Sequence, residues 1–154
     1  MKWISCVVGV ALTLSSFSVT AEIEEAPTQI NGVITINTAQ AKRLYDIGAL
    51  FVDVRSYAQW QRGHVEGSHN LDLKAGFRQL LTPGILNKET PLVIYGNSSY
   101  HMRGAIGSYL AALWGYQRVF FLRGGYFSWL VRDLPVTLKS DLPPEPEVSQ
   151  AARL

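Results

Sequence analysis

The chain has a single cysteine among its 154 residues, Cys6. Residues 7–154 therefore contain no thiol for a disulfide bond, a nucleophilic thiolate or a cysteine-ligated metal. An excess of charge of one sign is also missing, because the net charge is only +2 and no run of basic residues occurs. The composition therefore argues against nucleic acid as a partner.

The N-terminal segment lacks an apolar run of the ~20 residues that span a bilayer comfortably. Residues 4–14, which follow Lys2, form instead a run with the length of the hydrophobic region of an export signal. Val19 and Ala21 place a β-branched and a small residue just before a cleavage site. We expect residues 1–21 to be a signal peptide cut after Ala21, giving a periplasmic or secreted protein with no stable membrane insertion after cleavage. An uncleaved anchor and a buried first helix are the alternatives.

Apolar runs of strand length alternate with helical patterns along the rest of the chain. This alternation predicts an α/β fold, with a mainly parallel central sheet and helices on both faces. We expect strands at 33–36, 50–54, 69–71, 91–95 (the central strand) and 119–121. We expect helices at 39–47, 56–61, 73–81, 104–114 and 126–131, and a turn at 63–67.

Two details of these helices can be predicted from side chains. Asn37 or Thr38 is expected to cap the first helix. The helix at 104–114 reads as amphipathic, because apolar residues repeat at helical spacing at Ile106, Tyr109, Leu110, Leu113 and Trp114.

The expected organisation is one folded domain between two less ordered segments. Residues 22–29 are expected to be a linker, residues 30–136 the domain, and residues 137–154 a proline-rich, mobile tail.

The polar segment between the central strand and the next helix is the candidate ligand-binding loop. It lies at the carboxyl end of a strand, where ligands of such folds bind. Inward-pointing backbone amides and the following helix N-terminus would form an anion cradle. The loop comprises Gly96, Asn97, Ser98, Ser99, Tyr100, His101, Met102 and Arg103.

Three stretches in order, residues 51–71, 92–103 and 122–129, carry a resemblance to the rhodanese (sulfurtransferase) family. They contain Phe-Val-Asp-Val-Arg followed by Gly-His-Val-Glu-Gly, then the strand with its loop, then Gly-Gly-Tyr-Phe-Ser-Trp. The resemblance implies a three-layer α/β/α sandwich. It also implies a cysteine directly after the central strand, which takes the outer sulfur of thiosulfate as a persulfide and passes it to a thiophile.

Gly96 occupies the position that the resemblance assigns to this cysteine. We therefore expect no catalytic residue, no cofactor and no metal, and a binding or regulatory module that recognises an oxyanion, a small sulfur compound or a protein partner through the loop. An active thiosulfate sulfurtransferase is the alternative, and a scaffold role is a third.

Within the loop, the Ser98 and Ser99 hydroxyls are expected to cap the following helix. The alternative is a Ser–His pair, in which His101 would be the base that a serine needs for activation. Arg103 and His101 are donors suited to an oxyanion. Tyr100 is either an exposed partner contact or a lid over the loop.

Outside the loop, Asp53 and Arg55 are expected to hydrogen-bond backbone near the loop and fix its shape. The resemblance implies an acidic residue four positions after Arg55, where this chain has Gln59. His64 is expected to be a structural hydrogen-bonding residue.

Overall fold

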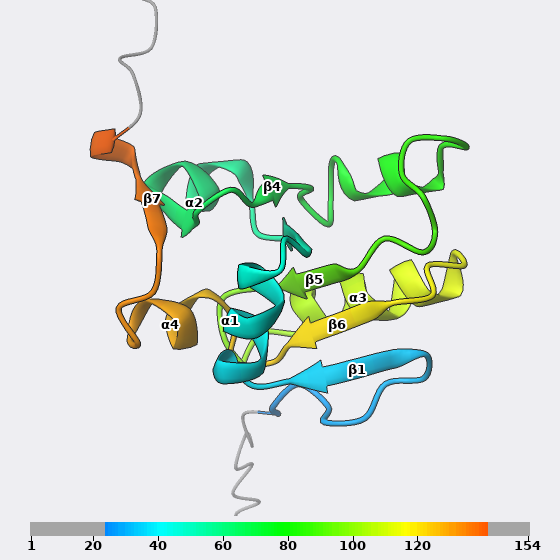
Figure 1. Ribbon diagram of the computed structural model, residues 1–154, viewed down its shortest axis with the longest axis horizontal. Helices are drawn as coiled ribbons and strands as arrows, with labels where there is room; N and C mark the ends of the chain where they lie inside the picture. Colours follow the sequence, from blue (N-terminus) through cyan, green and yellow to red (C-terminus); the bar gives the residue numbers. More distant parts are fainter. Residues whose placement is uncertain (1–23, 142–154) are drawn as a thin grey trace, which may run out of the picture.

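The computed structural model describes residues 24–141, so the expected signal peptide, Cys6 and residues 142–154 lie outside the described part. Five strands form one parallel sheet in the order β1-β6-β5-β2-β4 (Figure 1). These strands are β1 Val33–Ile36, β2 Leu50–Asp53, β4 His69–Asn70, β5 Leu92–Tyr95 and β6 Val119–Leu122. The predicted parallel sheet with its central strand at 91–95 is confirmed.

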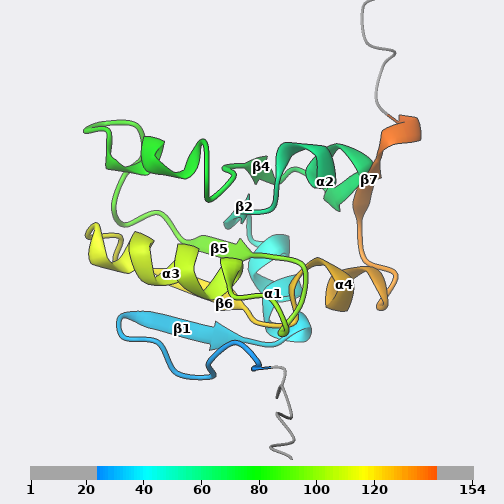
Figure 2. The same cartoon turned by 180° about the vertical axis from the view of Figure 1, so that it is seen from behind.

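The helices cover both faces of this sheet. They are α1 Thr38–Asp46, α2 Tyr57–Arg62, α3 Arg103–Leu113 and α4 Gly125–Leu130. Helix α1 lies in front of the sheet in Figure 1 and α3 behind it, as the reverse view in Figure 2 shows. No helix within residues 24–141 has both the length and the apolar character needed to cross a membrane.

Alternate residues of the strands serve two separate cores, as expected for a sheet buried on both faces. Phe51 and Val93 pack with Trp129 of α4 and Ala41 of α1. Val52 and its neighbours on the other face pack against α3 and the short 3-10 helix η1, Phe77–Leu81.

Side chains cap both α1 and α2. The Asn37 side chain accepts the Gln40 amide at 2.9 Å, and the Gln40 side chain accepts the Asn37 amide in return. This reciprocal capping box confirms Asn37 as the cap of α1. Ser56 and Gln59 form the same arrangement at α2, so Gln59 serves as a cap partner.

Two expected local structures are only partly correct, because the turn expected at 63–67 is confined to residues 66–67 and the helix expected at 73–81 is not α-helical. The expected turn at 63–67 begins as strand β3, Gly63–Val65, which pairs antiparallel with β7, Val136–Leu138. Its partner lies far along the chain, so local sequence carried no sign of it. Strand β7 also continues the fold past residue 136, into the expected tail. The expected helix at 73–81 contains only turns and η1.

Helix α3 buries a face of small residues, and of its apolar repeat only Leu110 and Trp114 pack, partly buried, against the core. Ile106, Tyr109 and Leu113 are 43%, 46% and 63% exposed. The buried residues are Gly104, Ala105, Gly107, Ser108 and Ala111. Small residues let α3 lie close to the sheet, and its outer side chains border a groove of about 370 Å³ beside Pro27 and Ile30.

Candidate functional site

The loop at 96–102 connects the carboxyl end of β5 to the first residue of α3. Its start is held by α4, because the Tyr126 amide donates to the Gly96 carbonyl at 2.8 Å and the Phe127 amide to the Asn97 carbonyl at 3.0 Å. Gly125 makes this contact possible. A Cβ on Gly125 would lie 2.5 Å from the carbonyl carbon of Asn97, and its φ of +61° suits glycine.

The Cα of Gly96 faces the N-terminus of α3 with the side on which another residue would carry its side chain. A Cβ at this position would lie 3.1 Å from the Gly104 amide nitrogen and 3.8 Å from the Arg103 Cβ. Gly96 is not among the described glycines with positive φ, so its backbone is one that other residues adopt. A Cβ here would require the Gly104 backbone to shift by a few tenths of an ångström, and a side chain would face the positive end of α3.

Backbone amides without a protein acceptor occur in the loop and at the start of α3. Within residues 24–141, the amides of Ser99, Arg103 and Gly104 donate to no protein acceptor. The first turn of any helix leaves such donors available. Helix α3 has 11 residues and no side-chain cap, so no protein side chain satisfies these donors.

The hydroxyl-capping prediction for Ser98 and Ser99 is wrong. The cap position of α3 is Met102, which makes no side-chain capping bond. The Ser98 hydroxyl instead accepts the Tyr100 amide at 3.3 Å and lies 3.0 Å from His101 Nδ1. Serine often makes such local bonds to nearby backbone, and here they shape the turn before α3.

The Ser98–His101 pair has the spacing of a hydrogen bond, but both side chains lie at the surface. No described carboxylate hydrogen-bonds the other ring nitrogen of His101, so the third group of a triad is lacking. The Arg103 guanidinium faces Asp72, with Nη1 3.7 Å from the carboxylate, and that buried nitrogen has no hydrogen-bond partner among the described residues.

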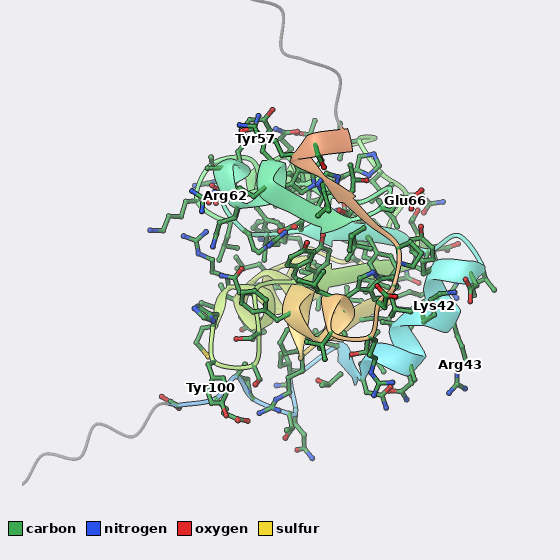
Figure 3. All side chains as sticks on the ribbon, turned by 90° about the vertical axis from the view of Figure 1, so that its left-hand side faces the viewer. Lys42, Arg43, Tyr57, Arg62, Glu66 and Tyr100 are labelled. Atoms are coloured by element: carbon green, nitrogen blue, oxygen red, sulfur yellow. The ribbon has the colours of Figure 1, made fainter. Side chains whose placement is uncertain are left out.

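Residues expected to be linker brace the loop from outside. The Ala26 amide donates to the Ser99 carbonyl at 2.6 Å, and Arg123 Nε donates to the Ala26 carbonyl at 2.8 Å. Arg123 also pairs with Glu25, and this interaction is the main cause that lowers the Glu25 pKa. Glu25 in turn raises the pKa of Tyr100, which is 56% exposed near the entering N-terminal segment (Figure 3).

Asp53 and Arg55 form a buried ion pair with each other, at 2.6 Å between Oδ2 and Nη2. Arg55 also donates to the Gly63 carbonyl at 2.7 Å, while Asn70 donates to the carbonyls of both residues. The expectation of bonds to backbone near the loop is met at Gly63, which lines one pocket with Asn97, whereas none of these bonds is to the 96–103 loop itself. Arg55 joins the end of β2 to β3 through Gly63, and Asn70 joins β4 to the same segment.

His64 is buried, with Nδ1 2.8 Å from the Trp60 carbonyl and its ring stacked on Trp60 at 3.9 Å. These contacts give His64 the structural hydrogen-bonding role that was expected of it. Within residues 24–141, no three histidine, cysteine or acidic side chains group together in a way that could hold a metal ion.

Sequence reasoning missed several residues beside the loop. Glu25 and Arg123 meet only through the tertiary fold. Arg62 and Tyr126 line a pocket that reaches Asn97, but they stand far apart in the sequence. No local pattern could have joined them.

Known proteins share both the sequence pattern and the fold. The profile of the rhodanese-like domain family matches residues 37–132. Thiosulfate sulfurtransferase GlpE of Ectopseudomonas mendocina is 33% identical over 97 residues, covering 61% of this chain and 82% of that protein. Thiosulfate sulfurtransferase 18 of Arabidopsis thaliana is 25% identical over 130 residues, which cover 75% of this chain and 92% of that protein.

Solved structures agree on the fold. The rhodanese-like domain of an Anabaena protein superposes with a TM-score of 0.60 at 18% identity, covering 73% of this chain and 85% of that one. The expected rhodanese-like α/β sandwich is confirmed. The chain belongs to the rhodanese-like domain family.

Proposed function

We propose that this chain is a catalytically inactive rhodanese-like domain that works as an exported binding module. The observation that carries the proposal is Gly96, whose missing side chain would point at the unpaired amides of α3. Residues 7–154 contain no thiol that could stand in for a sulfur-carrying cysteine. The loop therefore has the donors for an anion but no atom to accept sulfur covalently.

The ligand site in this proposal is the loop at 96–103. The amides of Ser99, Arg103 and Gly104 are its donors, and the α3 dipole adds positive potential. Export, with cleavage after Ala21, is part of the same proposal and rests on the N-terminal sequence alone.

Two relatives carry the name thiosulfate sulfurtransferase, which keeps an active enzyme as the competing account. The Ser98–His101 contact is the observation that favours it. A serine oxygen, however, forms no stable analogue of a persulfide, so this pair does not supply the same chemistry.

Titration with thiosulfate, followed through backbone amide resonances, tests the loop as a binding site. We expect saturable shifts at Ser99, Arg103 and Gly104, and no such shifts at Ala39 in the first turn of α1. The absence of saturable shifts in the loop would remove it as an anion site.

A further inference from the structure

A separate pocket of about 240 Å³ lies between α2 and α4 and touches the loop only at its start. It is smaller than the ~300–1,000 Å³ of sites for drug-sized ligands, so a small molecule suits it. Its walls are Arg55, Gln59, Arg62, Gly63, Asn97, Tyr126 and Phe127.

Arg55 supplies one free donor to this pocket. The side chain is only 3% exposed, and its Nε and Nη2 bond Asp53 and Gly63. Nη1 has no acceptor in the described part of the chain, yet it is not one of the unpartnered polar atoms that are fully buried from solvent. It is therefore a buried guanidinium nitrogen that still reaches the pocket.

Tyr126 supplies a second donor. The residue is 6% exposed, and its hydroxyl has no hydrogen-bond partner among residues 24–141 and is not sealed from solvent. A Cβ on Gly63 would lie 2.6 Å from this oxygen, so glycine leaves the room that the hydroxyl occupies. Burial raises the Tyr126 pKa, which keeps the proton available for donation.

The outer wall adds cationic and amide groups. Arg62 is exposed and has no ion-pair partner in the described structure. The Gln59 carbonyl oxygen accepts bonds from Ser56, which leaves its NH₂ group as a donor, and Asn97 brings a further amide. Among residues 24–141, no carboxylate lines the pocket.

The charges around the pocket leave a single uncompensated positive charge. Asp53 neutralises Arg55, so among the described residues that line the pocket only the Arg62 charge remains for a ligand. One positive charge compensates a monoanion, whereas a dianion would leave a second charge unpaired in a partly buried pocket, which desolvation disfavours. Phe127, 51% exposed, forms an apolar wall next to these donors.

We propose that this pocket binds a small, singly charged organic oxyanion with a tetrahedral head, of the sulfonate class. Arg55, Tyr126 and Arg62 supply one donor for each of the three oxygens of the head, and the organic group would lie against Phe127. The site goes beyond the proposed function, because none of these three donors belongs to the 96–103 loop.

The test is calorimetric titration of the purified full-length chain with benzenesulfonate. We expect saturable binding that Arg62→Gln and Tyr126→Phe each weaken about 10-fold, as for loss of a hydrogen bond to a charged group. Arg43→Gln is the matched control, since it removes the same charge from an exposed arginine on the other side of the view in Figure 3. We expect it to leave the affinity unchanged. Thermal unfolding checks that each variant is folded.

Two ligand controls make the outcome decisive. Methyl phenyl sulfone keeps the shape without the charge and should not bind, and benzoate should bind more weakly. Absent binding of benzenesulfonate, equal binding of either control ligand, or an equal loss in Arg43→Gln would overturn the proposal. Amide shifts separate this site from the loop: benzenesulfonate should move Arg62 and Phe127 but not Gly104.

Discussion

The Ala26 amide donates to the Ser99 carbonyl at 2.6 Å, which joins the N-terminal segment to the middle of the ligand loop. Ala26 is 1% exposed and packs with Ala105 of α3 and Phe121 of β6. The segment that follows the expected cleavage site therefore braces the ligand loop. Loop geometry and the N-terminal segment should change together.

The first prediction concerns Glu25→Gln. The folded-state pKa of Glu25 is lowered from 4.5, chiefly by Arg123 and then by Tyr100. The stabilising contribution is therefore fully present above pH ~4.5 and disappears as the pH falls through the lowered value. Glu25→Gln should lower Tm at pH 7, and this difference from the parent chain should vanish at lower pH. Glu89→Gln, at an exposed turn, serves as the control. An unchanged Tm at pH 7 would show that the Glu25 contact does not brace the segment.

A cysteine at position 96 should be an unusual thiol. In Gly96→Cys, the sulfur would extend over the α3 N-terminus and its unpaired amides, which favour a thiolate. Its pKa should lie below the ordinary ~8.5, with rapid iodoacetamide modification at pH 7. The control is Thr82→Cys, in an exposed turn, with Cys6→Ser in both proteins. Equal pKa values for the two thiols would contradict a cradle at this loop.

Replacement of Asp53 should be costly. Asp53→Asn leaves the 3% exposed Arg55 without a counter-ion, and breaking a buried pair in this way costs about 3–5 kcal/mol. Urea unfolding measures the loss. Asp46→Asn breaks only the surface pair with Lys42 and should cost less than about 1 kcal/mol. Similar losses for both variants would mean that Asp53 is not needed to compensate Arg55.

The small-residue face of α3 can be tested against its apolar face. In Gly107→Ala, the new Cβ would lie 3.1 Å from Val54 and 3.4 Å from Ile94, both fully buried. Crowding of this kind costs about 1–3 kcal/mol and should outweigh the ~1 kcal/mol gain in helix propensity. Leu113→Ala, at a 63% exposed site, should change stability by about 0.5 kcal/mol or less. The reverse order of the two effects would refute the close packing of α3.

Much of the fold could be predicted from local patterns. The apolar runs at 50–54 and 91–95 predicted strands β2 and β5 correctly, because parallel strands buried on both faces are almost continuously apolar. The cap at Asn37 followed from a side chain that acts on its own helix.

The failures share a physical cause. Strand β3 depends on pairing with β7, and the buried face of α3 depends on how near the sheet lies. The brace at Ala26 and the pocket beside Arg62 likewise join residues that are distant in the chain. Local patterns predicted where the loop would be, whereas its surroundings are set by tertiary contacts.

The most direct measurement of the central claim is thiosulfate:cyanide sulfurtransfer by the purified chain. With Gly96 in place of a sulfur-carrying cysteine, we predict a rate indistinguishable from the buffer blank, while the loop still binds anions. Turnover well above the blank, retained in both Ser98→Ala and Ser99→Ala, would contradict the account of this chain as a domain that binds and does not transfer sulfur.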